Sequence, residues 1–386
     1  MAHPPKPSVV AAIGMIGLAS AMGIGRFAFT PLLPLMQQQG QLDLAQGTWL
    51  AAANYLGYLI GALICARWAV PPATAARGGL IAVAASTLAM GFGGDLVLWW
   101  VWRFMAGAAS AFVLVGVSAW ALQALAAAQR PVWAGAVFAG VGMGMALAGL
   151  ISLLAGLTQQ EPQGAWLLMG GLSALVAMLA WRGLADAPAA PVAALAGPAN
   201  AALPPHAWKL IAAYGAFGFG YILPATFLPA MARQRFDDPL RFGAVWPLFG
   251  LAAAASTLIA AGLLRQVAAR RRWAAAQGVM AAGLLAVALS PSLGALVLCA
   301  FCVGGTFMVI TMAGMQEARL VAGPAAPRLM AAMTAAFAGG QLLGPLTVGP
   351  LAGRLLASGE AVPAAASGLA CAVLLLGLIL LVRPPG

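Results

Sequence analysis

The chain has 386 residues, of which 63% are hydrophobic and 7% are charged. A soluble globular domain carries about 25% charged residues, so this composition cannot cover a water-exposed surface, and a lipid bilayer must surround most of the molecule. The formal net charge of +11 comes from Lys and Arg residues scattered between apolar runs, which excludes a nucleic-acid-binding face.

Apolar segments of near 20 residues or longer follow one another along the chain, and a helix of that length crosses about 30 Å of hydrocarbon. Strands of a membrane barrel would instead alternate apolar and polar residues over about 10 positions. The predicted helices span residues 9–36, 46–69, 76–94, 96–126, 131–157, 164–184, 207–232, 242–264, 273–290, 293–316, 327–356 and 362–382. We therefore predict an all-α integral membrane protein with twelve transmembrane helices.

The Lys and Arg residues between these helices indicate the orientation of the chain, because cytoplasmic loops carry an excess of them. With the N-terminus inside, 13 of these residues face the cytoplasm and four face outward, whereas Arg26 and Arg103 fall inside predicted helices. The outer four are Arg233, Arg235, Arg241 and Arg354. We expect both termini in the cytoplasm, in a multi-pass protein of the cytoplasmic (inner) membrane of a bacterium.

The two halves of the chain resemble each other. GIGRFAFTPLLPLM at 23–36 matches GFGYILPATFLPAM at 218–231 with an offset of 195 residues, and Gly107 matches Gly304 with an offset of 197. An Ala- and Pro-rich stretch between the halves has the composition of a flexible linker. The prediction is an N-terminal six-helix half at 1–184, a cytoplasmic linker at 185–206 and a C-terminal six-helix half at 207–386, arranged as parallel repeats.

Four segments resemble the YbfB/YjiJ branch of the major facilitator superfamily. GIGRFAFTPLLPLM at 23–36 is similar to the signature of its first helix, and GGQLLGP at 339–345 to its eleventh. WRF at 102–104 followed by Gly107 resembles the arginine motif of the fourth helix, and GVGMGMALAG at 140–149 the glycine-rich motif of the fifth. The resemblance implies a major facilitator fold and a transporter whose central cavity is lined by helices 1, 4, 7 and 10.

Two departures from the superfamily patterns limit what the resemblance implies. The fifth-helix segment lacks the proline that many exporters have, which disfavours a drug–proton antiporter. The loop ARWAVPPATAARGG at 66–79 has Arg67 and Arg77 but no acidic residue. The gating ion pair of this loop motif therefore cannot be transferred to this chain.

Arg26 lies near or just beyond the middle of the first predicted helix. A charge at that depth costs about 2.5–3.5 kcal/mol, so such a residue normally faces a cavity or a partner. No Asp or Glu lies deep in any predicted helix to neutralise it. Arg26 either binds an anionic group such as a carboxylate, or bonds backbone carbonyls where Gly23, Gly25 and Pro31 disturb the helix.

Other polar residues in the helices are candidates for a substrate site, and each could equally be a packed structural residue. Arg103 could add to a positive field in the cavity, with Asp95 as a near partner. The resemblance to the superfamily's arginine motif implies that Arg103 bonds the backbone of the first helix or takes part in proton handling. Tyr221 takes the repeat position of Arg26. Asn54 and Tyr58 share one face of the second helix, whereas Tyr55 should point elsewhere.

The remaining candidates form three groups. Gln341 and Trp246 complete the predicted substrate-binding set of Arg26, Arg103, Tyr221, Asn54 and Tyr58. Asp95, Glu317, Gln123 and Gln316 are candidates for coupling or gating. Glycine pairs, Gly57 with Gly61 and Gly140 with Gly144, put small residues on one helix face, where one half could slide on the other. Pro31, Pro34, Pro224 and Pro229 should bend the first and seventh helices toward their outer ends.

The sequence predicts a secondary active transporter that works by alternating access. No G-x-x-x-x-G-K-[ST] motif is present, so ATP should not drive it directly. Our preferred substrate is a small organic anion, with protons or a counter-anion as coupling partner. The rival is a proton-coupled exporter of amphiphilic or aromatic compounds, with Phe27, Phe29, Trp246 and Phe249 forming an apolar pocket.

Other classes fit the sequence poorly. An intramembrane enzyme needs paired acids, a histidine or an activated nucleophile in the membrane, and the only histidines, His3 and His206, lie outside it. A receptor would need an extramembrane domain to relay its signal. Cys299 and Cys302 form a C-x-x-C without a second ligand pair, so we expect no metal site and no cofactor. We expect a monomer in the bilayer.

Overall fold

The computed structural model describes residues 6–67, 70–185, 203–235, 238, 240, 243–264, 266–290, 292–322, 325–355 and 362–382, and within them the chain forms only helices and their connections. The helices are α1 (Pro7–Leu18), η1 (Ala19–Arg26), α2 (Phe29–Gln38), α3 (Leu44–Arg67), α4 (Pro72–Gly91), α5 (Leu96–Ala127), η2 (Pro131–Trp133), α6 (Ala134–Leu157), α7 (Pro162–Ala185), α8 (Ala207–Arg235), α10 (Val245–Gly262), α11 (Ala269–Leu289), α12 (Leu293–Ala322), α13 (Ala326–Leu355) and α14 (Val362–Val382). The predicted all-α class is confirmed.

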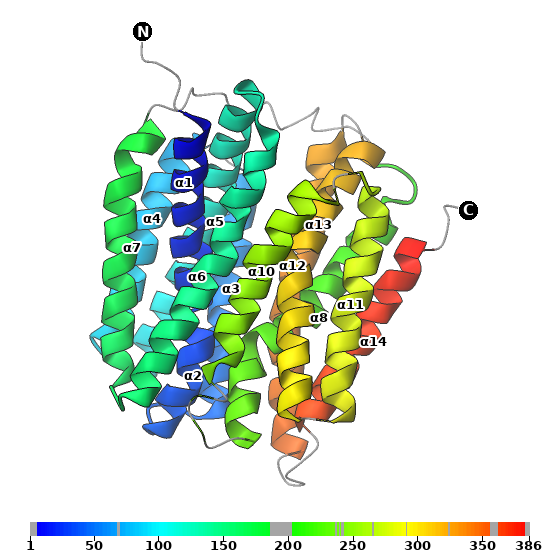
Figure 1. Cartoon of the computed structure of the whole chain (residues 1–386). Helices are drawn as coiled ribbons and strands as arrows, with labels where there is room; N and C mark the ends of the chain where they lie inside the picture. The colour runs from blue at the N-terminus through cyan, green and yellow to red at the C-terminus, as the bar shows by residue number, and fades with distance from the viewer. Residues whose placement is uncertain are drawn as a thin grey trace.

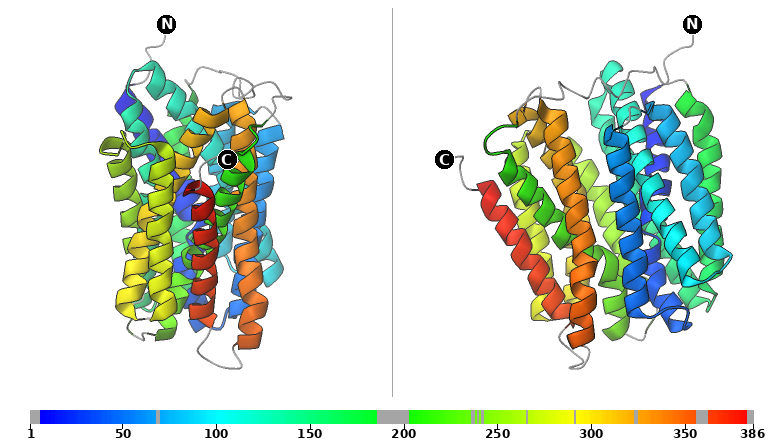
Figure 2. Two further views of the ribbon diagram at one scale, coloured as in Figure 1. Left: turned by 90° about the vertical axis from the view of Figure 1, so that its right-hand side faces the viewer. Right: turned by 180° about the vertical axis from the view of Figure 1, so that it is seen from behind.

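The helices stand roughly parallel in two groups that lie side by side, α1 to α7 in one and α8 to α14 in the other (Figure 1). The same two groups are separate when the molecule is seen from behind (Figure 2). The start of α1 and the end of α14 lie on the same side of the bundle, as an even number of crossings requires. The predicted linker, 185–206, falls mostly on residues 186–202, outside the described part of the chain. The predicted cytoplasmic location of that side stays a prediction.

The lengths and surfaces of the helices fit a bilayer. Within the described residues, ten helices are long and apolar enough to cross a membrane, and the first of them is the composite segment Pro7–Gln38. The helices α8 and α13 are not among the ten but have 29 and 30 residues. Large apolar side chains on the outer surface, such as Leu179, Met178 and Leu376, are more than half exposed. A surface of this kind is stable against lipid rather than water, so the chain is a multi-pass membrane protein.

The first crossing is interrupted in its middle. Residues 19–26 form a π-helix, a rare type of helix with i→i+5 hydrogen bonds that is frequently found at functional sites. The α-helix resumes only at Phe29, and Pro31 and Pro34 lie inside the resumed helix α2. The interruption at residues 27–28 lies just before Pro31, whose ring nitrogen cannot donate to the carbonyl four residues earlier, and a bend at Pro34 stays a prediction. The seventh helix, α8, runs through Pro224 without interruption.

Contacts between the two groups reveal the internal repeat. Thr30 of α2 donates a hydrogen bond from Oγ1 to the carbonyl of Ala225 in α8, at 3.1 Å. These two residues are separated by 195 positions, the repeat offset, so equivalent points of the two halves meet, as they do beside a two-fold axis. A Cβ at Gly107 would collide with the backbone of Asn54, and one at Gly304 with the backbone of Phe249, again 195 residues from Asn54.

Glycines set the closest helix contacts, but not all of them where the sequence suggested. Gly57 and Gly61 face the α5 backbone, so this pair packs within the first half and not between the halves. Gly140 and Gly144 likewise face α1 and η1. Between the halves, α6 packs on α10, where Gly142 faces the backbone around Gly250. A spacing of four residues correctly predicts that two glycines share one face of a helix, but it does not predict which helix packs against that face.

Two neighbouring glycines of α12 provide a matched test of this packing. A Cβ at Gly304 would collide with the Phe249 backbone, whereas nothing lies within 4 Å of one at Gly305. We predict that Gly304→Ala lowers the free energy of unfolding by about 1–3 kcal/mol, because backbone cannot move aside as a side chain can. Gly305→Ala should have no effect or a slightly stabilising one, because Ala favours a helix. Thermal unfolding of the purified variants in detergent measures both, and equal midpoints would contradict the assigned contact.

Candidate functional site

Arg26 is the last residue of η1 and lies close to the middle of the 32-residue segment Pro7–Gln38. Its side chain is 2% exposed. The residues around it come from both groups of helices: α3 and α5 from the first, and α8, α10, α12 and α13 from the second. The site is therefore the meeting point of the two halves, and in this structure it is closed on all sides by protein.

Arg103 holds the end of η1 in place. Its Nη1 donates to the carbonyl of Gly25 at 3.1 Å, and its Nη2 donates to the carbonyl of Arg26 at 2.8 Å. A backbone carbonyl at a helix interruption inside a membrane must find a partner within the protein, because lipid offers none. The planar fork of a guanidinium can serve two such carbonyls at once. Arg103 thus fixes the backbone at Arg26. Among the roles considered for Arg103, this is the one in which it bonds the backbone of the first helix.

Asn54 connects α3 to the same structure. Its Nδ2 donates to the carbonyl of Arg103 at 2.9 Å, and its side chain is fully buried. Gly107, one turn after Arg103, lets the two helices approach at this point, because a Cβ there would overlap Asn54. Asn54 therefore bonds the backbone of Arg103, the residue whose side chain holds the end of η1.

The guanidinium of Arg26 has partners in both halves. Its Nη2 donates to Oε1 of Gln341 in α13, across the interface. Its central carbon lies 3.6 Å from the ring centroid of Tyr58, 5.7 Å from that of Tyr55 and 5.3 Å from that of Phe27. The expectation that Tyr55 points away is wrong: Tyr55 and Tyr58 are three residues apart, so they differ by only about 60° around the helix and both reach the guanidinium. Cation–π contacts of this kind are worth about 2 kcal/mol when desolvated.

Several donors at this interface have no acceptor among the described residues. They are Nε and Nη1 of Arg26, Nε2 of Gln341, the hydroxyl of Tyr221 and Nε1 of Trp246. Tyr221 is 1% exposed and Trp246 fully buried, so the protein itself leaves these groups unsatisfied. A buried donor without a partner costs about 1–3 kcal/mol, and more when it is charged. No salt bridge to Arg26 is found in the described part of the chain, whose acidic residues lie elsewhere.

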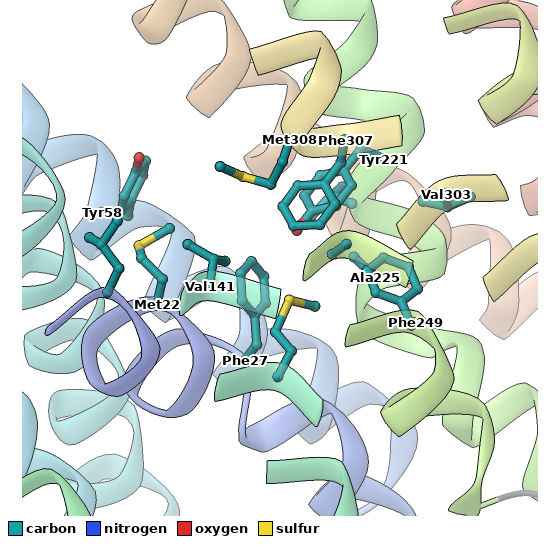
Figure 3. Close-up of a cluster of buried hydrophobic side chains, with 14 of the residues drawn as sticks. Met22, Phe27, Tyr58, Val141, Tyr221, Ala225, Phe249, Val303, Phe307 and Met308 are labelled. Atoms are coloured by element: carbon teal, nitrogen blue, oxygen red, sulfur yellow. The ribbon is translucent and has the colours of Figure 1, made fainter. Parts of the chain in front are cut away.

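An array of aromatic rings from the second half meets Phe27, the residue after Arg26. Figure 3 shows Phe27 directed from the first half toward Tyr221 and Phe307. The ring of Tyr221 stacks on Phe307, with centroids 5.0 Å apart and planes 19° apart, and meets Phe27 edge-on at 6.4 Å. Trp246 lies 6.4 Å from Phe27 as well. The array continues through Phe249, Phe217 and Phe337.

The candidates for coupling and gating lie away from this site. Asp95 is exposed, and its Oδ1 accepts from the backbone N–H of Leu98 at 2.9 Å. It caps the N-terminus of α5, whereas the donors of Arg103 go to backbone carbonyls. Gln316 is exposed and accepts from Nη2 of Arg272. Glu317 is buried near the end of α12, beside Arg270, and the Gln123 side chain lies outside the described part.

The structure brings together most of the predicted substrate-binding set and adds members to it. Tyr58 and Gln341 contact the guanidinium of Arg26, Tyr221 and Trp246 contact the neighbouring Phe27, and Arg103 and Asn54 bond the backbone behind them. Sequence reasoning missed Phe307 and Phe337. The sequence FAG at 337–339 repeats FAG at 138–140 with an offset of 199 residues, so the internal repeat could have identified Phe337. Nothing in the sequence singled out Phe307.

A conservative exchange tests the role of Arg103. We predict that Arg103→Lys lowers the free energy of unfolding by about 2 kcal/mol, because a single ammonium cannot serve both carbonyls in the geometry of the fork. Arg182→Lys, at an exposed position of α7, is the matched control and should unfold like the wild type. If Arg103→Lys also unfolds at the wild-type temperature, these hydrogen bonds do not stabilise the interruption.

Comparisons with known proteins agree with the geometry. The family model described as uncharacterised MFS-type transporter YbfB matches residues 18–381. No match was found among curated proteins. A crystal structure of the nucleoside transporter NupG is similar in fold, with a TM-score of 0.72, covering 97% of this chain and 98% of that chain at 12% sequence identity. That likeness concerns the fold alone.

Proposed function

This chain belongs to the YbfB family of MFS-type transporters, and we propose that it carries a small organic anion across the membrane by binding the anion at Arg26. The chain is a secondary transporter with a membrane-embedded, small-molecule site and not an enzyme. The anionic character of the substrate rests on one observation: a buried guanidinium between the halves that has two donors without acceptors and no acidic partner in the described residues.

The argument from charge is one of energy. A buried cation without a counter-charge is costly, and the amide of Gln341 together with the Tyr58 ring offsets only part of that cost. An anion placed on Nε and Nη1 would add charge-assisted hydrogen bonds in the bidentate geometry that guanidinium prefers. The remaining donors, from Gln341, Tyr221 and Trp246, would take further acceptor atoms of the same molecule. All five unsatisfied groups can donate, which favours a ligand rich in oxygen.

The Arg26–Gln341 hydrogen bond also offers a route for alternating access. It joins η1 of the first half to α13 of the second, so it must break when the halves separate toward either side. The anion would then take the place of Gln341 on Arg26 and let the halves close around it. Rocking of two halves about a midplane site is how transporters with parallel repeats reach both aqueous phases.

The location and energy source complete the proposal. The Lys and Arg bias supports a cytoplasmic location of both termini, and we propose the inner membrane of a bacterium as the location of the protein. Within the described residues the acid nearest to a span interior is Glu317, at the end of α12 and close to Arg270. Exchange against a second anion, or a proton carried with the substrate's own acid group, fits this better than a proton carrier at the centre. Gating at Asp95, Gln316 or Gln123 stays a prediction.

The rival function, proton-coupled export of amphiphilic or aromatic compounds, draws on the ring array around Phe27, Trp246 and Phe249. It differs in one testable respect, because it gives Arg26 no direct part in binding. An uncharged aromatic compound that binds tightly, with an affinity that does not depend on Arg26, would favour this rival.

Removal of the charge is the first test. We predict that Arg26→Gln weakens the binding of small carboxylates such as acetate, succinate and benzoate by about 10- to 100-fold, which corresponds to the loss of a charged hydrogen-bond donor pair. Isothermal titration of the purified protein in nanodiscs measures this affinity. Arg130→Gln, which removes an exposed charge after α5, is the control and should bind like the wild type. Equal affinities in Arg26→Gln and wild type would refute the anion site.

A carboxylate built into the site should compete with the substrate. We predict that Gln341→Glu is at least as stable as the wild type but loses carboxylate binding by about 100-fold, because its own carboxylate pairs with Arg26. Gln341→Met, of similar length and without charge, is the matched variant and should retain most of the affinity. Transport in proteoliposomes should follow the same order. Undiminished binding in Gln341→Glu would mean that the anion does not use Arg26.

A further inference from the structure

The residues opposite Arg26 add a second requirement to the ligand. The guanidinium carbon of Arg26 already lies over the Tyr58 ring, 3.6 Å from its centroid, and 5.3 Å from the centroid of Phe27. Beyond Phe27, the second half presents two stacked pairs of rings, Tyr221 on Phe307 and Trp246 on Phe249, each at 5.0 Å. The apolar side chain of Met308 lies beside the first pair (Figure 3). All of these rings are buried: Phe27 directly follows η1, and the other rings lie on the four helices α3, α8, α10 and α12.

The rings of Phe27, Tyr221 and Trp246 lie at the interface where the two halves must separate during transport. Phe27 belongs to the first half, and its contacts with Tyr221 and Trp246 cross to the second half, as Figure 3 shows for Phe27 and Tyr221. These contacts are wide, with centroids 6.4 Å apart, whereas the stacks within the second half are close, at 5.0 Å. When the halves separate, the faces around Phe27 lose their partners first. A flat ring bound between the halves would replace those lost contacts.

From these positions we infer that the substrate is an aromatic carboxylate, with its carboxylate on Arg26 and its ring among Phe27, Tyr221, Trp246 and Phe307. This inference rests on the proposed anion site and narrows its ligand. Ring pairs in offset or edge-on geometry gain more than the burial of an equal apolar area, so a planar ring is favoured over a saturated ring of the same size. The unsatisfied groups of Tyr221 and Trp246 add donors at the edge of this ring pocket.

A set of matched acids separates the requirement for charge from the requirement for a ring. Benzoate and cyclohexanecarboxylate carry the same charge at pH 7 and have similar size, but only benzoate is aromatic. We expect the full-length protein in nanodiscs to bind benzoate about three- to tenfold more tightly than cyclohexanecarboxylate, as judged by titration calorimetry. Benzyl alcohol, which has the ring without the charge, should bind far more weakly than either acid.

Exchange of one ring provides the second measurement. Phe307→Leu should reduce the preference for benzoate over cyclohexanecarboxylate to less than about twofold, because it removes the ring that stacks on Tyr221. Phe301→Leu, on the same helix but 46% exposed on the outer surface, should keep the wild-type preference. The ratio of two affinities in one variant does not depend on how much of the preparation is active.

Each outcome has a distinct meaning. Binding of both acids with equal affinity to the wild-type protein would overturn the aromatic inference and leave the anion site intact. The anion site itself would be overturned if benzyl alcohol bound as tightly as benzoate. It would also be overturned if the protein bound neither of the two acids. A wild-type preference that survives in Phe307→Leu and is lost in Phe301→Leu would place the ring elsewhere and overturn the assignment made here.

Discussion

The interruption of the first helix inside the membrane is the feature on which the other parts of the site depend. A π-helix that ends at Arg26 displaces the backbone from its regular path, and the carbonyls at its end need partners that lipid cannot provide. Arg103 supplies two donors to these carbonyls, and Asn54 in turn bonds the carbonyl of Arg103. The glycine at position 107 makes this approach sterically possible. Without these hydrogen bonds, the end of η1 would not be held in the position that directs Arg26 toward the interface between the halves.

The hydrogen-bonding capacity of Arg26 is only partly used, and this is the basis of the proposed anion site. Its hydrogen bond to Gln341 and its contact with Tyr58 satisfy one donor and one face of the guanidinium, while Nε and Nη1 have no acceptor in the described residues. The proposed anion would form a stronger, charge-assisted bond with Arg26 than the neutral amide of Gln341 does, and could therefore displace Gln341.

The two halves share a scaffold but differ in chemistry. Glycine-mediated contacts recur in both halves, at Gly107 with Asn54 and at Gly304 with Phe249. At the equivalent positions the first half has Arg26 and Asn54, and the second half has Tyr221 and Phe249. The buried charge thus comes from the first half, whereas the second half supplies Gln341 and most of the stacked rings. A substrate that combines a carboxylate with a ring would bind to both and would draw the halves together.

The sequence alone was sufficient to predict the helices, the internal repeat and the presence of an arginine within the first span, because these follow from runs of apolar residues, a constant offset and the cost of a charge in lipid. The partner of Arg26 could not be predicted in this way, since Gln341 lies 315 residues away and only packing brings the two together. The approach of Tyr55 and the helices that cover Gly57 and Gly140 were likewise decided by neighbouring helices. Local patterns determine which segments become helices, whereas the contacts between faces far apart in the chain decide what each buried side chain meets.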